Sequence, residues 1–191
     1  MTDEALMTRF QEGSEAAFEQ IVRQWEGRML NFFYRAVGDL DTAKDLRQEL
    51  FFRLYTRGGT YRGKGSFAAW LYSIATNLLR VHFNKAKAYA PAHDADPDGQ
   101  PEAVEQADKA PTADEVARRN ERARLVREML GDLSPRDREV LMLRFFGNLR
   151  FEEISTVLGI GQGAARLRAI RAVERLRRMV AERGFTAGDL L

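Results

Sequence analysis

The chain has 191 residues and no cysteine, and its 30 basic and 28 acidic side chains give a net charge of +2. The lack of cysteine excludes disulfides, thiolate metal sites and a cysteine nucleophile. No stretch approaches the roughly 20 apolar residues of a membrane span, and the polar, acidic start is unlike a signal peptide, so we expect a cytoplasmic protein that does not insert into membranes.

The first ninety residues have the apolar spacing of helices throughout. This spacing predicts four helices, over residues 3–11, 15–37, 41–57 and 67–87. Ser14 and Ser66 are the expected N-caps of the second and fourth helices, and Gly38 is expected to end the second. The side chains expected to face inward are Phe18, Ile21, Val22, Trp25, Met29, Phe33, Leu46, Leu50, Phe51, Leu54, Phe67, Leu71, Ile74, Leu78 and Val81.

The third helix has a polar face opposite its apolar one. Asp45, Gln48, Glu49 and Phe52 follow one another at i, i+3, i+4 and i+7. A polar face is usually only solvated, but an exposed aromatic ring within it is typical of a docking surface.

The fourth helix and the glycine-rich loop before it carry groups suited to single-stranded DNA. Ser73, Asn77, Arg80 and Asn84 form one stripe of the helix at i, i+4, i+7 and i+11. The loop side chains are Arg57, Tyr61, Arg62 and Lys64. A base can stack on an aromatic ring while cations hold the backbone, so we expect Tyr61 to stack on a base. Trp70 is expected in the core or at the edge of this site.

A break in the helical pattern follows the fourth helix. Residues 91–113 are net negative, whereas 1–90 and 114–191 are each net positive. Prolines, acids and a shortage of large apolar residues predict a flexible acidic linker over 91–112. The expected fold is therefore all-α, with one small helical domain over 1–90 and another over 113–191.

The second domain is predicted to begin with a long helix over residues 113–130. Ser134 and Pro135 then have the capping serine and first-turn proline of a helix start. The apolar face of this next helix is expected to comprise Val140, Leu141, Leu143 and Phe145.

Two further helices, over 151–158 and 162–182, are separated by a short turn at Gly159 to Gly161, which is the helix-turn-helix pattern. One face of the second helix is expected to pack inward, through Ala165, Ala169, Ala172, Val173, Leu176 and Val180. The opposite face carries Arg166, Leu167, Ile170 and Arg171, suited to phosphates, guanines and thymine methyl groups. Arg168 is expected to contact a phosphate or a neighbouring acid.

Three stretches, in this order and followed by the helix-turn-helix, resemble the extracytoplasmic-function sigma factors of bacterial RNA polymerase. They are AKDLRQELFFRLY from residue 43, YRGKGSFAAWLYSIATNL from residue 61, and LSPRDREVLMLRFF from residue 133. The resemblance covers nearly the whole chain. It implies a first domain like sigma region 2, a second like sigma region 4, and a protein that directs core RNA polymerase to promoters.

The resemblance also implies a role for each stripe. Asp45, Gln48 and Glu49 match positions that grip a coiled coil of the largest polymerase subunit. Tyr61 and Asn77 match the pocket that captures an unstacked non-template base of the minus-ten element, while the outward face of 162–182 reads the minus-thirty-five duplex. The implied partners are core polymerase, duplex and single-stranded promoter DNA, and an anti-sigma factor, for which exposed Phe52 and Leu167 are candidate contacts.

Some residues depart from the family pattern. Ala164 and Ala165 replace a common threonine and valine, and Leu167 replaces a small polar residue. Arg150 stands at the usual serine or threonine cap, and Val81 where a polar or acidic side chain is frequent. We interpret these as changes of promoter preference, although a member that no longer initiates transcription fits them too.

Other functions have weaker support in the sequence. The loop 58–65 resembles a phosphate-binding loop, but Gly65 replaces the hydroxyl residue and a helix precedes it. The glycines 159 and 161 fit a dinucleotide fingerprint without its βαβ unit. His82 and His93 are the only histidines, one on a helix and one in the linker, so we expect no metal site and no catalytic base. We also expect no enzyme activity, no cofactor and no small-molecule substrate. A sigma-like adaptor and an autonomous helix-turn-helix regulator stay open as alternatives.

Overall fold

The chain is described here by a computed structural model that covers residues 1–63, 65–89, 121 and 124–184. Within these residues the secondary structure is helical and contains no strand. The helices are α1 (Asp3–Gln11), α2 (Glu15–Val37), α3 (Leu40–Arg57), η1 (Gly58–Thr60), α4 (Phe67–Tyr89), α6 (Pro135–Leu141), η2 (Met142–Phe146), α7 (Phe151–Leu158) and α8 (Gln162–Glu182). Residues 124–131 are also helical. The predicted linker over 91–112 lies outside the described residues.

The helix starts follow the predicted capping chemistry. The Ser14 hydroxyl accepts a hydrogen bond from the Ala17 N–H, and Ser66 does the same for Ala69 at 3.1 Å. α3 begins one residue before the predicted start, because the Asp39 carboxylate accepts the Thr42 N–H at 2.7 Å. These bonds satisfy N–H groups that have no partner inside the helix.

Helices α1 to α4 form an N-terminal bundle around a mainly aromatic and aliphatic core. The expected residues Ile21, Trp25, Met29 and Phe33 of α2 are buried. Phe32 is buried too, although the sequence pattern did not predict it. Val81 was expected to face inward, but its side chain is 45% exposed.

Residues 124–184 form a C-terminal bundle whose third segment is wound more loosely than an α-helix. α6 continues into the π-helical turn η2, in which each turn contains an additional residue. The added residue rotates the side chains that follow, so that Met142 is buried and Phe145 is 61% exposed. The prediction that Phe145 faces the core is therefore wrong, while those for Val140, Leu141 and Leu143 are confirmed.

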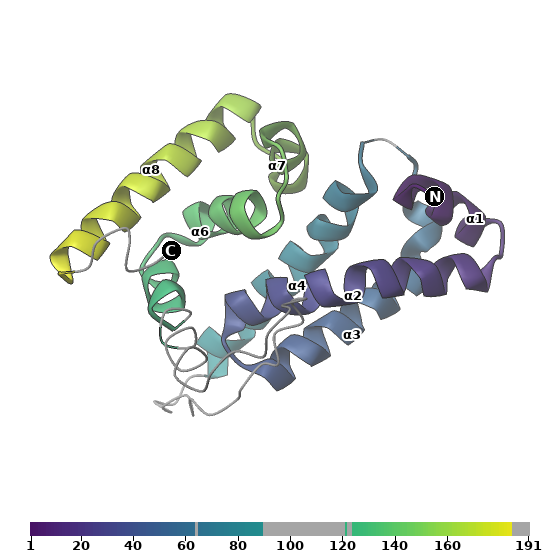
Figure 1. Cartoon of the computed structure of the whole chain (residues 1–191), viewed down its shortest axis with the longest axis horizontal. Helices are drawn as coiled ribbons and strands as arrows, with labels where there is room; N and C mark the ends of the chain where they lie inside the picture. Colours follow the sequence, from purple (N-terminus) through teal and green to yellow (C-terminus); the bar gives the residue numbers. More distant parts are fainter. Residues whose placement is uncertain (64, 90–120, 122–123, 185–191) are drawn as a thin grey trace, which may run out of the picture.

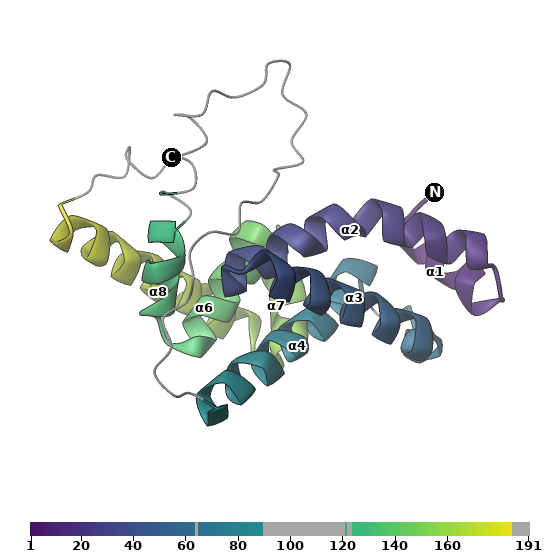
Figure 2. The same cartoon turned by 90° about the horizontal axis from the view of Figure 1, so that it is seen from below.

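The two bundles pack against each other, as Figures 1 and 2 show from two sides. Their contact, which we call the seam, joins α2 and α4 to α6, η2 and α7. Buried side chains form a continuous cluster across it, from Phe32 and Tyr72 to Leu143 and Ile154. At one point a Cβ added to Gly147 would lie 3.2 Å from Cζ of Tyr72, so a larger residue would crowd the seam there.

Candidate nucleic-acid and polymerase interfaces

The polar face of α3 is exposed on the N-terminal bundle. Asp45 and Gln48 are exposed, and Phe52 has 61% of its surface in solvent. Glu49 is half-buried and accepts a hydrogen bond from Nε of Arg53, one helical turn on, at 2.7 Å. The four predicted residues therefore share one accessible face, on which an apolar ring stands beside acidic and amide groups.

One aromatic residue adjoining this face was missed from the sequence. Tyr55, three residues after Phe52, is 52% exposed. Its ring centroid lies 5.1 Å from that of Phe18 and 5.7 Å from that of Phe10, so it is held against α1 and α2. The i, i+3 spacing from Phe52 could have indicated it.

The four residues of the α4 stripe lie on one face of the helix, but solvent does not reach them equally. Asn77, Arg80 and Asn84 are exposed, whereas Ser73 is half-buried and donates its hydroxyl proton to the Trp70 carbonyl at 2.6 Å. The Arg80 guanidinium does not project freely into solvent. It donates two hydrogen bonds to the Glu139 carboxylate of α6, at 2.6 and 2.8 Å.

The loop between α3 and α4 differs from the prediction at its tyrosine. Tyr61 is only 6% exposed, with its ring 5.9 Å from that of Phe67 and 5.3 Å from that of Trp70. Burial, together with the negative charges of Glu4 and Asp3, raises the pKa of its hydroxyl. The expectation of an exposed Tyr61 ring that stacks on a base is thus corrected: neighbouring aromatic rings already cover it.

The same loop is held at its backbone. Nε2 of Gln11 donates hydrogen bonds to the carbonyls of Gly58 and Tyr61, at 2.9 and 2.7 Å. Arg57 and Arg62 project from it and are exposed, while Lys64 lies outside the described residues. Trp70, expected in the core or at the edge of this site, is half-buried and packs against the Tyr61 ring.

The helix-turn-helix lies where the sequence predicted it. Gly159 ends α7 with φ of +64°, a left-handed conformation, and α8 begins two residues beyond Ile160. Ala165, Ala169 and Ala172 are buried. This burial turns the opposite face of α8 to solvent.

The outward face of α8 combines cations with apolar groups. Arg166 and Arg171 are exposed, and Leu167 and Ile170 are 47% and 49% exposed. Arg168 is half-buried. The Arg166 guanidinium also lies 5.6 Å above the Phe151 ring of α7, which restricts where that side chain can reach.

The unusual cap of α7 has a partial substitute. Arg150 makes no side-chain capping bond, but the Glu153 carboxylate accepts its backbone N–H at 2.8 Å. Glu153 also accepts a hydrogen bond from the Ser66 hydroxyl of the N-terminal bundle at 2.5 Å. Burial acts to raise the pKa of Glu153, but these two hydrogen bonds and the charge of Arg150 outweigh it and lower the pKa. The carboxylate therefore stays charged where the bundles meet.

The described residues contain neither a metal-binding cluster nor a membrane-spanning helix. No group of three or more histidine, cysteine or acidic side chains there could hold a metal ion. No helix in the same part of the chain is long and apolar enough to cross a membrane.

Comparisons with protein families match both bundles. The family described as Sigma-70 region 2 matches residues 21–89, and the family described as Sigma-70, region 4 matches residues 129–178.

Individual relatives match along nearly the whole chain. It is 33% identical to RNA polymerase sigma factor CarQ of Myxococcus xanthus, over 92% of this chain and 96% of that protein. It is 31% identical to RNA polymerase sigma-H factor of Pseudomonas aeruginosa, over 90% of each. ECF RNA polymerase sigma factor SigW of Bacillus subtilis is 27% identical over 88% of this chain and 91% of its own.

Solved structures share the fold. The structure of CnrH in complex with the cytosolic domain of CnrY has a TM-score of 0.70 and 22% identity, over 94% of this chain and 97% of that one. The sigma factor RpoE from Bartonella quintana, in complex with the anti-sigma factor NepR, has a TM-score of 0.61 and 18% identity, over 86% and 96%.

Proposed function

Because the chain belongs to the extracytoplasmic-function sigma factors, which recognise promoters for RNA polymerase, we propose that it opens promoter DNA by capturing an unpaired base of the non-template strand on α4. Extruding a base costs a few kcal/mol, which binding of the flipped base can offset without hydrolysis of a nucleotide. Such work belongs to the cytoplasm, where core polymerase and DNA meet.

The observation that carries this proposal is the presence of two exposed faces of different chemistry on one chain. On α4, exposed Asn77 and Asn84 offer amides that can donate to and accept from base edges. On α8, exposed Arg171 can bond to phosphate or to guanine, and Leu167 and Ile170 can contact thymine methyl groups. The first set suits single strands, and the second suits a duplex groove.

With Tyr61 buried, base capture on α4 falls to groups that solvent reaches. Asn77 is the central amide of the stripe, and Arg57 and Arg62 supply positive charge from the neighbouring loop. Positive charge that follows the strand's backbone is a usual part of single-strand binding, and the Asn77 amide beside it can hydrogen-bond to a base edge.

The assignment of single-strand capture to α4 and duplex binding to α8 is tested with Asn77→Ala and Arg171→Ala in holoenzyme. We expect Asn77→Ala to slow strand opening, with little loss of affinity for the duplex. Strand opening is measured by the permanganate reactivity of unpaired thymines. Arg171→Ala should weaken duplex binding by about 1–3 kcal/mol if it makes a paired base contact, with opening restored on a pre-melted template.

Matched controls are Asn31→Ala on α2 and Arg177→Ala on α8, both exposed in this structure. Each removes the same side-chain type away from the proposed contact. Equal defects of Asn77→Ala and Arg171→Ala on the pre-melted template would overturn the assignment of separate single-strand and duplex faces.

We propose that the α3 face of Asp45, Gln48, Glu49 and Phe52 binds core polymerase. Its support is an exposed phenylalanine among polar side chains on a rigid helix. The purified chain should associate with core polymerase that lacks a sigma subunit, and Phe52→Ala should weaken this association. If the wild-type chain did not associate, the sigma assignment itself would fail, and an autonomous regulator would be favoured.

An anti-sigma factor is the further partner that we propose. Two solved structures of similar fold are complexes, one of CnrH with the cytosolic domain of CnrY and one of RpoE with the anti-sigma factor NepR. Exposed Phe52 and Leu167 are the candidate contacts on this chain. Unchanged affinity for the inhibitor after Phe52→Ala would remove the first of them.

A further inference from the structure

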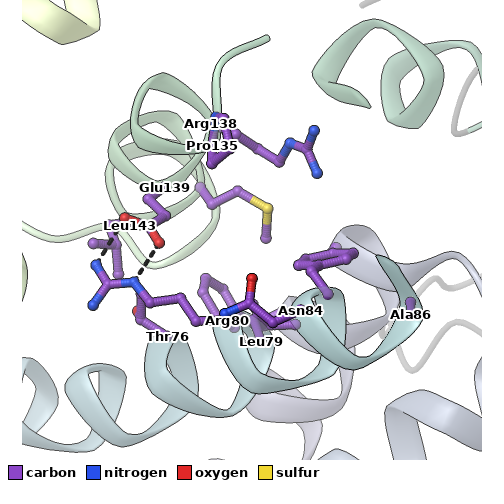
Figure 3. A pocket seen from close by; sticks show the side chains of 13 residues that line it. Thr76, Leu79, Arg80, Asn84, Ala86, Pro135, Arg138, Glu139 and Leu143 are labelled. Carbon is purple, nitrogen blue, oxygen red and sulfur yellow. Dashed lines mark hydrogen bonds and ion pairs between the residues drawn. The ribbon is translucent and has the colours of Figure 1, made fainter. Parts of the chain in front are cut away.

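The α4 stripe is tied to the other bundle through Arg80. Its Nε and one terminal nitrogen donate to the two carboxylate oxygens of Glu139, at 2.6 and 2.8 Å, as the dashed lines of Figure 3 show. This paired geometry is the one that arginine also forms with a phosphate group. The Arg80 side chain is 43% exposed and the Glu139 side chain is 20% exposed. Glu139 therefore takes the position that an anionic ligand of Arg80 would take.

Several other polar contacts cross the seam, and most of them involve partly exposed side chains. Arg35 lies 4.6 Å above the Phe146 ring, and Arg138 lies 5.5 Å from the Phe83 ring. The Ser66 hydroxyl donates to Glu153. Cation–π contacts at partly exposed sites contribute little each.

The seam is also incompletely packed. A cavity of about 380 Å³ lies between α2, α4 and the α6–η2 segment, directly beside the Arg80–Glu139 pair. Figure 3 shows the side chains that line it. Its lining is largely apolar and includes Phe32, Leu79, Phe83 and Met142. Atoms that face a void lose dispersion contacts, so this surface holds the bundles together less strongly than a close-packed core of the same area.

We propose that the seam is an autoinhibitory contact, in which Glu139 occupies Arg80 and keeps the α4 stripe from DNA until the bundles separate. The idea rests on the proposed role of α4 in base capture. In the closed state Arg80 cannot neutralise a phosphate, and α7 and α6 stand beside the helix that must receive a strand. In the sequence 31 residues separate Tyr89 from Glu121, and a fully extended chain of that length spans on the order of 100 Å.

The absence of cysteine makes this state directly measurable. Lys85→Cys on α4 and Arg136→Cys on α6, both at exposed positions next to residues that line the cavity, allow a spin label or fluorophore on each bundle of the full chain. We expect one short inter-label distance for the labelled chain without further changes. Glu139→Gln keeps the shape of the side chain but removes its charge, and should add a population with longer distances.

Two further readouts sharpen the test. Glu139→Gln should raise the affinity of the isolated chain for a single-stranded minus-ten oligonucleotide several-fold. Raising the salt concentration should lengthen the inter-label distances in the labelled chain that keeps Glu139, because salt screens the attraction within a charge pair. The same change of salt should alter these distances less in Glu139→Gln. The control is Glu128→Gln, whose carboxylate pairs with Arg124 inside the C-terminal bundle at 3.4 Å and should leave both readouts unchanged.

The outcomes distinguish the autoinhibitory contact from the proposed function. Unchanged inter-label distances in Glu139→Gln, with the fold intact by circular dichroism, would show that the Arg80–Glu139 pair does not hold the bundles together. Longer distances with unchanged oligonucleotide affinity would overturn its inhibitory role. The base-capture proposal is tested separately, by the effect of Asn77→Ala on strand opening in holoenzyme. In holoenzyme the two bundles are bound to polymerase, so the result does not depend on the contact between them.

Discussion

Tyr61 and Arg80 show how the setting of a single residue decides its use. Both were predicted to meet DNA from their residue type and their place in the sequence. Phe67 and Trp70 cover the Tyr61 ring, while Glu139 binds the Arg80 guanidinium from another bundle. A tyrosine in a loop is thus no guarantee of an exposed ring, and an arginine on a helix face is no guarantee of a free cation.

Tyr72 provides a prediction at this scale. Its side chain is 2% exposed, with its ring centroid 4.9 Å from that of Phe32. Burial raises the pKa of its hydroxyl from 10.0 to about 12, while the charge of Arg28 acts in the opposite direction. Because the folded pKa is the higher one, the corresponding stability is present below pH 10 and is lost as the pH rises toward 12.

Tyr72→Phe keeps the ring and cannot ionise. Between pH 10 and about 12 the variant should lose less unfolding free energy than the wild type, by about 2–3 kcal/mol. Urea denaturation at neutral and alkaline pH measures this difference. Exposed Tyr55→Phe is the control and should follow the wild type. An equal alkaline loss in Tyr72→Phe would contradict the role assigned to burial.

At the scale of the helix, local backbone geometry decides which face is presented. The π-helical turn η2 exposes Phe145 and buries Met142, which an uninterrupted 3.6-residue period did not predict. At the helix-turn-helix, by contrast, the glycine signal was sufficient. Gly159 has the left-handed conformation that ends α7, and α8 keeps a regular period behind it.

Two glycines at this turn should respond in opposite directions to the same substitution. Gly159 has φ of +64°, whereas Gly163 lies inside α8, and neither would place a Cβ within 4 Å of another group. Gly159→Ala should lower the free energy of unfolding by about 1 kcal/mol, because alanine is strained in the left-handed region. Gly163→Ala should raise it by about 0.5–1 kcal/mol through helix propensity.

Chemical denaturation of both variants measures the two effects. Since neither substitution creates a contact, the sign of each depends on backbone conformation alone. A stabilising Gly159→Ala would mean that the turn does not have the left-handed geometry described here.

At the scale of the whole molecule, the seam joins two helical bundles into one continuous apolar cluster. Such coupling predicts that the bundles unfold together when the seam is closed. Phe146 is central to it, since this half-buried ring packs against both hydrophobic clusters and lies under Arg35.

Phe146→Ala should therefore lower stability by about 1–3 kcal/mol and separate the thermal transition into two, seen as a calorimetric enthalpy that exceeds the van't Hoff value. Phe145→Ala removes the neighbouring ring, which is 61% exposed, and should change stability by less than about 0.5 kcal/mol. Equal losses for the two variants would mean that Phe146 does not couple the bundles.

The sequence by itself determined α1 to α4, α7 and α8, the caps at Ser14, Ser66 and Ser134, the turn at Gly159 and the outward face of α8. The predicted helix over 113–130 lies partly outside the described residues. Each of these depends on residues within a few positions of one another, which hydrophobic period and capping chemistry describe. The family resemblance, confirmed by the comparisons, added the class of function.

Only the tertiary structure decided the burial of Phe32 and Tyr61, the pairing of Arg80 with Glu139 and the cavity beside it. The two members of that pair are 59 positions apart, so no local period could place them together. Whether a side chain on a helix meets water, DNA or another bundle depends on how helices are packed, and packing is a property of the whole chain.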